Sequence, residues 1–303
     1  MKVVVTGGTG FLGKALLESL RADGHALTVL TRRPARTPGE VQWTPESGIG
    51  PWIGAFEHAD AVVNLAGEPI AEGRWTHERK RRILASRVDA TRAVVTALRE
   101  TGTRGAVLLS GSAVGYYGTE RREPLDESSS PGDDFLASVC REWEAEALRA
   151  SANARVVLLR TGFVVARDGG ALPQLALPFH FFAGGPVGSG RQVMSWMHRD
   201  DWVAMVRWAL STDTVHGPIN LTAPVPVTNR EMASAIGRAL HRPSFMPAPA
   251  FALRIALGEM ADALILNGQR VLPRAAMNGG FRFRYETIDA ALDEIYGAPV
   301  PRT

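Results

Sequence analysis

The hydrophobic positions of this chain change their spacing from one segment to the next in a regular order. Short runs rich in β-branched residues predict strands at 2–6, 26–31, 61–67, 106–112 and 155–165. Apolar residues at helical spacing between them predict helices at 11–24 and at about 76–100. Strands that alternate with helices are typical of βαβ units. We therefore predict an α/β fold built on a doubly wound parallel sheet.

The pattern changes after Val165. Segments 166–174 and 182–192 are rich in glycine and proline, so we expect loops there. A helix is expected over 198–210, with Asp200 or Asp201 in a favourable capping position near its start. Two further helices, separated by proline, are expected between residues 222 and 265. The second half of the chain therefore builds something other than more parallel sheet.

Composition narrows the classes of protein to consider. Of the 303 residues, 45% are hydrophobic and 21% are charged, which is typical of a globular chain with a sizeable core. Cys140 is the only cysteine, so an intramolecular disulfide is excluded and a reducing compartment is expected. Glycines break the first apolar run too early for a signal peptide, and no run reaches the ~18 residues of a membrane span. We expect a cytoplasmic protein without a membrane partner.

The stretch TGGTGFLG, residues 6–13, joins the first strand to the first helix. Gly8, Gly10 and Gly13 fit G-x-G-x-x-G, and Gly7, Gly10 and Gly13 fit the related G-x-x-G-x-x-G. Such glycines permit a tight turn and let backbone amides approach a pyrophosphate at the helix N-terminus. Close packing of a strand against a helix would explain the glycines alone, but their position between a strand and a helix is the context that a dinucleotide site requires. We therefore predict such a site.

The end of the second strand indicates which dinucleotide binds. An acidic residue at this place, about 20 residues after the glycines, binds the ribose hydroxyls of NAD. Here the strand ends in Thr31, Arg32 and Arg33, and two guanidiniums suit a 2′-phosphate. A solvated turn would explain the same residues. Together with the glycine loop, the arginines favour NADP(H).

Several motifs resemble those of an extended short-chain dehydrogenase/reductase: TGGTGFLG, NLAG at 64–67 and SGSAVGYYG at 110–118. Others resemble one atypical branch, the epimerase family whose last residues form a C-terminal domain of unknown function. These motifs are GRWTHERKRRILASR at 73–87, FLASVCREWE at 135–144, GSGRQVMSWMHRDD at 188–201, and the closing segments 267–273 and 280–295. The resemblance covers nearly the whole chain. It implies a Rossmann fold and NADP(H) binding, but it names no substrate.

The resemblance also implies positions for cofactor-binding residues. Leu65, Ala66 and Gly67 would form a strand-end turn against the adenosine and ribose, and Arg87 would face the cofactor. Further cofactor-binding positions are Phe11, Leu12, Ser110 and Val164. We assign residues 1–165 to an NADP-binding Rossmann domain, to which 196–222 would return. Residues 166–303 would form a smaller substrate-binding lobe.

Arg87 also stands out from the residues alone. It falls within a buried stripe at helical spacing that is formed by Leu84, Val88, Thr91, Val95 and Leu98. An arginine on a buried face needs an anion. A cofactor phosphate would supply one, and so would an internal carboxylate.

The expected catalytic helix lacks its chemistry. Ordinary members of the superfamily carry Y-x-x-x-K, in which the tyrosine transfers a proton and the lysine lowers its pKa. Here the helix offers either Phe135 with Val139 or Leu136 with Cys140. Neither pair supplies a phenol or an ammonium, so the standard acid and base have been lost.

Other residues near this helix are candidates for catalysis. Ser112 is suitably placed for the superfamily's serine, as is Ser110, which would also fit a strand-end turn. Tyr116 and Tyr117 lie in the loop that follows, where a phenol could reach a substrate oxygen. Tyrosines in this loop are also common packing residues of the superfamily, and packing explains both residues better.

These observations leave two principal hypotheses. The first is an NADP(H)-dependent, epimerase/dehydratase-like oxidoreductase that acts on a small molecule, either a sugar nucleotide or a carbonyl compound. The second is an NADP(H)-binding redox sensor or scaffold protein without turnover, which the missing Tyr-Lys pair favours. The basic run 74–82 would suit a nucleic-acid-binding surface, but a solvated helix face explains the run better.

We also expect neither a nucleic-acid partner nor a metal site, since no suitable ligand spacing is present. The helices at about 76–100 and 134–150, with Leu136, Val139 and Trp143, would offer an apolar face to a second copy in a homodimer. The same face would alternatively cover the sheet.

Overall fold

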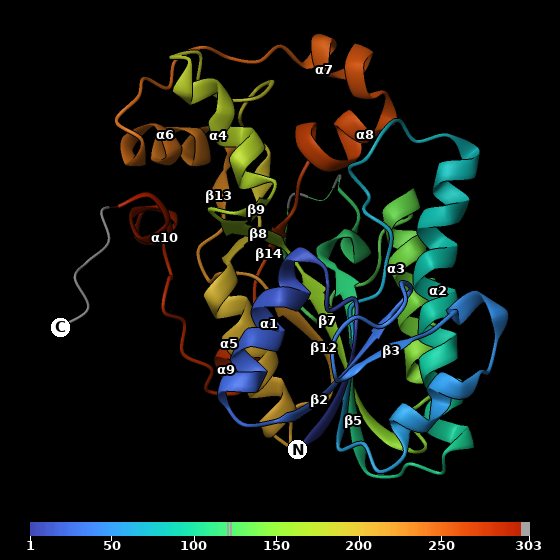
Figure 1. Cartoon of the computed structure of the whole chain (residues 1–303). Coiled ribbons are helices and arrows are strands. Elements are labelled where there is room, and N and C mark those ends of the chain that lie inside the picture. Colours follow the sequence, from blue (N-terminus) through green and yellow to red (C-terminus); the bar gives the residue numbers. More distant parts are fainter. Residues whose placement is uncertain (120, 122, 298–303) are drawn as a thin grey trace.

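A seven-stranded parallel sheet forms the centre of the protein, in a computed structural model that describes residues 1–119, 121 and 123–297 (Figure 1). The strand order is β12-β7-β5-β4-β1-β2-β3. The strands are β1 (Lys2–Thr6), β2 (Ala26–Thr31), β3 (Glu40–Gln42), β4 (Ala61–Asn64), β5 (Ala106–Ala113), β7 (Ala154–Thr161) and β12 (Gly217–Leu221). The chain builds outward from β1 in one direction and then in the other. The predicted doubly wound, Rossmann-like fold is therefore confirmed, and its topological switch point lies between β1 and β4.

Helices cover both faces of the sheet, and this burial explains the near-continuous apolar runs of the central strands. Helices α1 (Phe11–Ala22) and α5 (Arg199–Ser211) pack on one face (Figure 1). Helices α2 (His77–Glu100) and α3 (Phe135–Leu148) pack on the other face. The alternation predicted for the first half of the chain matches these elements closely.

The apolar face of α3 covers the sheet of its own chain. Val139 is 3% exposed and Trp143 7% exposed. A Cβ on Gly111 of β5 would lie 2.7 Å from the Trp143 ring, so the glycine makes room for the indole. Val139 and Trp143 therefore cover the sheet, which is the alternative expected for this face, and they are not available to a second copy; Leu136 is half-buried. A homodimer stays a prediction without an assigned face.

A second lobe lies beyond the carboxyl end of the sheet (Figure 1). Its core joins α4 (Leu172–His180), α6 (Asn229–Ala239) and α10 (Ile288–Tyr296). The lobe also contains two small sheets. One has the strand order β11-β8-β9 and consists of β11 (Trp196–His198), β8 (Phe163–Ala166) and β9 (Gly169–Gly170); the other pairs β10 (Val193–Met194) with β13 (Val227–Thr228). The other elements are α7 (Ala250–Leu257), α8 (Glu259–Ala261), α9 (Arg274–Asn278), the π-helical segment Asp262–Leu266, and three 3₁₀ helices at Pro45–Ser47, Pro51–Phe56 and Val114–Tyr117.

Two predicted elements differ from those observed. The single strand expected at 155–165 is two strands, β7 and β8, which separate at Gly162, where a Cβ would lie 2.3 Å from the backbone oxygen of Ser195. The loop expected at 166–174 includes the start of α4. Leu172, Ala176 and Phe179 of that helix are buried at helical spacing, a pattern that the surrounding glycines and prolines obscured.

The start of α5 also differs from the prediction. The N-cap is His198, whose Nδ1 accepts a hydrogen bond from the backbone amide of Asp200 at 3.1 Å. Asp201 is buried and accepts hydrogen bonds from the amides of Arg284 and Tyr285, both at 2.9 Å. Its carboxylate therefore fastens the C-terminal segment to the Rossmann domain rather than capping the helix.

The C-terminal segment reaches the sheet at a second place. Strand β14 (Arg270–Val271) pairs in parallel with β6 (Pro124–Leu125), which belongs to the loop after β5. The Asn220 side chain on β12 donates to the backbone oxygen of Leu272 at 3.0 Å. The second lobe therefore holds the loop region in which the candidate tyrosines lie.

Candidate dinucleotide site

The turn between β1 and α1 is shaped by glycines that no other residue could replace. Gly7 has a φ of +69°, and a Cβ there would lie 2.5 Å from the backbone oxygen of Leu65. A Cβ on Gly13 would lie 2.3 Å from the backbone oxygen of Gly7. Gly10 is the N-cap of α1 and has no side chain to bond its amides. The turn therefore presents the amides at the helix N-terminus to an anion, as a dinucleotide pyrophosphate requires.

Arg32 and Arg33 follow β2 and are exposed. Among the described residues, neither guanidinium has a hydrogen bond or an ion pair; only the backbone of each is engaged, with Thr31 and Gln42. Two cations at the end of the second strand that have no partner in the described part of the chain suit the 2′-phosphate of NADP(H). An acid to bind the ribose hydroxyls of NAD is absent from this strand end.

A buried chain of hydrogen bonds fixes the strand ends around the switch point. Thr6 donates to Asn64 at 2.6 Å, Asn64 donates to Thr91 at 2.8 Å, and the Trp143 indole donates to Thr91 at 2.9 Å. The Thr6 hydroxyl also accepts from the amide of Ala66 at 3.2 Å. The predicted turn residues Leu65 and Ala66 are thereby held directly beside the glycine loop.

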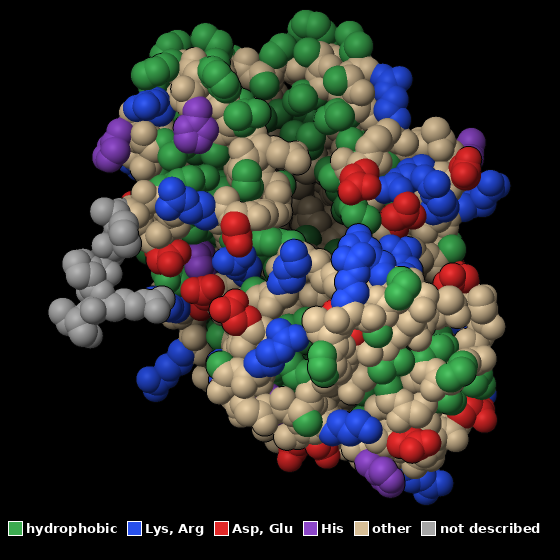
Figure 2. Space-filling view, viewed as in Figure 1, with side chains coloured by type: hydrophobic (Ala, Val, Ile, Leu, Met, Phe, Trp, Pro, Cys, Tyr) green, Lys and Arg blue, Asp and Glu red, His purple; other side chains and the backbone are tan. Residues whose placement is uncertain are grey.

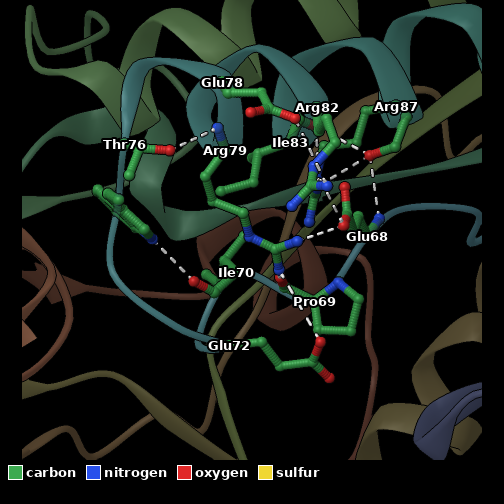
Figure 3. A network of polar contacts seen from close by, with 12 residues as sticks. Glu68, Pro69, Ile70, Glu72, Thr76, Glu78, Arg79, Arg82, Ile83 and Arg87 are labelled. Atoms are coloured by element: carbon green, nitrogen blue, oxygen red, sulfur yellow. Dashed lines mark hydrogen bonds and ion pairs between the residues drawn. The ribbon is translucent and has the colours of Figure 1, made fainter.

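The loop after β4 is fastened to the start of α2 by a cluster of charges (Figure 3). Arg79 is 7% exposed, forms an ion pair with Glu68 and donates to the backbone oxygen of Pro69. Arg82 lies 3.8 Å from Glu68. The Trp75 indole donates to the backbone oxygen of Ile70 at 2.8 Å.

Other cations of the basic run bind the second lobe. Arg74 donates to the backbone oxygens of Ile255 and Ala256, and Lys80 pairs with Glu259 at 2.6 Å. Several cations of the run 74–82 are thus engaged within the chain, which weakens the basis for a nucleic-acid surface.

Arg87 lies where α2 passes the strand-end turn. Its guanidinium donates to the backbone oxygen of Ile83 at 3.0 Å and lies 5.3 Å from the centre of a Trp143 ring. A Cβ on Gly67 would lie 3.2 Å from the guanidinium carbon, so Gly67 gives the side chain its space. Burial lowers the pKa of Arg87. Among the described residues it forms no ion pair, so its charge is available to a bound anion.

Ser110 and Ser112 are both buried in β5. The Ser112 hydroxyl donates to Glu144 at 2.6 Å, and Glu144 receives two hydrogen bonds from Arg160, each of 2.8 Å. A serine has one proton to donate. Because that proton goes to an internal carboxylate, Ser112 can only accept a hydrogen bond from a substrate.

The two candidate tyrosines differ sharply. Tyr117 is fully buried, donates to Asn220 at 2.8 Å and accepts from Arg160 at 2.9 Å. Burial raises the pKa of Tyr117 to about 12. The Tyr116 ring lies over the Arg160 guanidinium at 3.5 Å and is only half-buried. Its hydroxyl has no hydrogen-bond partner within the described part of the chain.

The structure decides which register of α3 faces β5. A Cβ on Gly115 would lie 3.3 Å from the Leu136 Cβ and 4.0 Å from the Cys140 sulfur. Phe135 instead packs against Trp75, with ring centres 5.2 Å apart. Leu136 and Cys140 therefore occupy the positions facing the site. Burial, followed by the charge of Glu144, raises the pKa of the Cys140 thiol to about 12, which makes it inert.

Val164 lies in the core between the sheet and α5, and the partly buried Phe11 and Leu12 pack against that core. The Phe11 ring also meets the β9 turn, where a Cβ on Gly169 would lie 2.4 Å from it. These side chains pack the glycine loop against the second lobe. In the described residues no group of His, Cys, Asp and Glu is arranged to hold a metal ion, and none of the described helices combines the length and the apolar character that a membrane span needs.

The buried Glu144–Arg160 ion pair was missed by sequence reasoning. Arg160 interrupts the apolar strand VVLLRT, and a charged residue in such a strand signals a buried partner. That partner is 16 positions away on α3. The Arg79–Glu68 pair left no comparable signal, because Arg79 stands among exposed arginines.

Comparison with known proteins agrees with this arrangement. Residues 3–221 match the NAD dependent epimerase/dehydratase family, and residues 248–295 match a domain of unknown function, DUF1731. The chain is 45% identical over 302 residues to an Arabidopsis thaliana protein described as "Epimerase family protein SDR39U1 homolog, chloroplastic", covering 97% of this chain and 86% of that one.

Two solved structures are similar over nearly the whole of this chain. The human epimerase family protein SDR39U1, solved with NADPH, superposes with a TM-score of 0.90 at 36% identity and covers 98% of this chain and 99% of its own. A nucleoside-diphosphate sugar epimerase from Corynebacterium glutamicum gives a TM-score of 0.79 at 34% identity, over 97% of this chain and 58% of that one. On the strength of the matched family region and of these relatives, the chain belongs to the NAD dependent epimerase/dehydratase family.

Proposed function

We propose that the protein is an NADP(H)-dependent oxidoreductase that acts on a small molecule, a carbonyl compound or a sugar nucleotide. The substrate would bind where the sheet meets the second lobe, at a boundary that is visibly hollowed (Figure 2). The observation that carries the proposal is a glycine turn shaped for a pyrophosphate beside three cations, Arg32, Arg33 and Arg87, that form no ion pair within the described residues. The NADPH in the human relative supports the choice of cofactor.

Each part of the dinucleotide site binds a different group of the cofactor. The amides at the start of α1 bind the pyrophosphate, and the glycines allow its close approach. Arg32 and Arg33 bind the 2′-phosphate, which distinguishes NADP(H) from NAD(H). Arg87 faces the cofactor from α2 and supplies a cation near Cys140, the position where the superfamily's lysine would stand. The nicotinamide, when bound, supplies or accepts the hydride.

Proton transfer falls to Tyr116 in this proposal. Ser112 and Tyr117 already donate their protons to Glu144 and Asn220. Tyr116 keeps a hydroxyl without an internal partner among the described residues, and its ring is held against Arg160. Tyr116 would donate a proton to the substrate oxygen as the hydride is transferred.

One observation favours a different function. The two positions of α3 where the superfamily's tyrosine and lysine would stand hold Leu136 and Cys140, so the usual acid and base are replaced by apolar groups. A protein that binds NADP(H) and reports its redox state would need no acid or base. The alternative is therefore a non-catalytic NADP(H) sensor or scaffold.

A turnover assay separates the two functions. The unmodified protein is tested for NADPH oxidation against a panel of carbonyl compounds and sugar nucleotides, alongside Tyr116→Phe and the control Tyr296→Phe on α10. We expect Tyr116→Phe to lower kcat by about 10²-fold while NADPH affinity is unchanged. Full activity in Tyr116→Phe would exclude the assigned donor. Tight NADPH binding without oxidation of any compound would establish the sensor instead.

A further inference from the structure

Helix α7 has an unusual composition for its place in the structure. Its sequence is AFALRIAL, apolar except for Arg254, and none of its residues is buried. Phe251 is 66% exposed and Ile255 69% exposed. A helix that is apolar on all sides normally lies inside a protein or against a membrane. Something outside the described chain is therefore expected to cover it.

Two other segments extend this apolar surface. Phe181 and Phe182, directly after α4, are 74% and 58% exposed. Segment 245–248 runs beside them, since the amide of Met246 donates to the backbone oxygen of Gly184 at 3.0 Å. We call the combined surface the lobe tip; it comprises Leu177, Phe181, Phe182, Phe245, Met246, Phe251 and Ile255. Figure 2 shows hydrophobic side chains gathered over this end of the molecule. Exposed apolar side chains gathered at one end of a molecule mark an interaction surface.

The two segments that carry the lobe tip contain basic residues but no acidic ones. Segments 169–199 and 232–258 carry the tip, and neither contains an aspartate or a glutamate. They do contain arginine and histidine. Arg238 and Arg254 are paired with acids from elsewhere, Asp289 and Asp262. Arg242 of segment 232–258 forms no ion pair within the described residues, so this cation is available to an anionic surface.

A pocket beside the tip is suited to a phosphate. Its volume is about 630 Å³, and its lining includes Arg238, His241, Arg242, Ser234 and Ser244. The Arg242 Nε and the Ser244 hydroxyl are buried and have no hydrogen-bond partner within the described residues. The Arg242 guanidinium lies 4.6 Å from the centre of the Phe182 ring, which places the pocket next to the apolar surface. Buried polar atoms without partners favour a ligand that supplies an acceptor.

We propose that the lobe tip docks on a bilayer that contains anionic phospholipids. The phenylalanines enter the interface between headgroups and acyl chains, and the Arg242 pocket takes a headgroup phosphate. Apolar insertion combined with cations is the pairing that gives stable but reversible binding. The expectation of no membrane partner rested on the lack of a spanning segment, and a peripheral surface needs none.

Vesicle co-sedimentation tests the proposal with the full chain. Vesicles of phosphatidylcholine alone are compared with vesicles that also contain phosphatidylglycerol. We expect binding to the anionic vesicles, at least tenfold weaker in Phe181→Ser/Phe251→Ser. The matched control is Ile49→Ser/Leu148→Ser, which removes two exposed apolar residues of the Rossmann domain, 55% and 46% exposed, and leaves binding unchanged. Arg242→Gln should reduce the preference for anionic vesicles while keeping residual binding.

Three outcomes would overturn the proposal. The first is no binding to anionic vesicles, or equal binding by the tip variant and its control. The second is a change of oligomeric state in the tip variant without any vesicle binding, which would assign the surface to a second copy. The third is stabilisation by inorganic phosphate alone, lost in Arg242→Gln, with no vesicle binding, which would make the pocket a site for a free anion. Thermal melting first confirms that each variant is folded.

Discussion

At the scale of single residues, the candidate cofactor-binding side chains and the candidate catalytic side chains differ in whether their hydrogen-bond donors have partners inside the chain. Arg32 and Arg33 keep both guanidiniums unpaired among the described residues, whereas Ser112 and Tyr117 donate their protons to partners inside the chain. A side chain whose donor has no internal partner can donate a hydrogen bond to a ligand. A side chain whose donor is already bonded inside the chain stabilises the fold instead. Tyr116 is the candidate catalytic residue that still has its donor.

Arg32→Glu tests the cofactor choice. The unmodified protein should bind NADPH at least tenfold more tightly than NADH, equivalent to about 1.4 kcal/mol. The variant should reduce or reverse that ratio, because a carboxylate repels the 2′-phosphate. Titration calorimetry with both cofactors measures it, and Arg36→Glu in the following loop serves as the control. Equal affinities in the unmodified protein would contradict the assignment.

Glu144→Gln tests the buried network. The change leaves the Arg160 charge without its anion, so we expect a loss of roughly 3–5 kcal/mol in the free energy of unfolding. Ser112→Ala removes one hydrogen bond to a charged group and should cost about 1.5–3 kcal/mol. Urea unfolding measures both, with the half-buried Ser138→Ala on the same helix as a control. A Glu144→Gln variant as stable as that control would show that the pair contributes nothing.

At the scale of elements, the comparison of sequence with structure depends on how local each signal is. The glycine spacing between β1 and α1 lies within eight residues and was predicted from them. The register of α3 could not be chosen from sequence, because Phe135 and Leu136 are both apolar. Only the contact of Leu136 with Gly115 decides it. The start of α4 was missed because its prolines and flanking glycines resemble a loop, although its buried spacing is helical.

Leu136→Tyr/Cys140→Lys tests the observed register of α3. It places a phenol and an ammonium on the face toward β5, so we expect slow NADPH-dependent reduction of reactive dicarbonyl compounds to appear. General acid catalysis contributes about 10² to 10⁴-fold when the acid is well placed. The introduced ammonium would be buried near Arg87, so the variant should also melt at a lower temperature. The matched control, Phe135→Tyr/Val139→Lys, carries the same groups in the other register, and equal activity in both variants would refute the register.

At the scale of the whole molecule, the second lobe and the Rossmann domain are joined by specific polar contacts. Asp201 on α5 accepts two amides of the C-terminal segment, and the His198 Nε2 lies 3.1 Å from Glu294 on α10. The Tyr285 ring lies 4.1 Å from the His198 ring. A disturbance at this junction should therefore affect both lobes together.

Acidification should loosen the junction through His198. Burial lowers the pKa of His198, although Asp200, Glu294 and Asp201 oppose the shift. The unfolded chain therefore takes up the proton at a higher pH than the folded chain. The His198 contribution is full above the ordinary pKa of about 6.5 and is lost as the pH falls below it. Protonation of Nδ1 would also remove the α5 cap.

The fall in melting temperature between pH 7.5 and pH 5.5 (both about one unit from the ordinary histidine pKa) measures this effect. His198→Asn keeps a capping side chain and cannot be protonated, so its fall should be smaller than that of the unmodified protein. His216→Asn, at a histidine without a described partner, should change nothing. An equal fall in the His198 variant and the unmodified protein would remove His198 as the cause.

The pairing of β14 with β6 has a consequence for the order in which the protein is made. Strand β6 follows the segment that contains Tyr116 and Tyr117, but its partner β14 is synthesised about 145 residues later. At the usual rates of translation this delay is on the order of ten seconds or more. The hydrogen bond from Tyr117 to Asn220 can form only after β12 has been synthesised. Asn220 in turn donates to the backbone oxygen of Leu272, which is synthesised later still. A chain that ends before β14 would therefore hold the glycine turn together with Arg32 and Arg33 while the segment with Tyr116 and Tyr117 still lacks its partner strand, and it should bind the cofactor before that segment is in place.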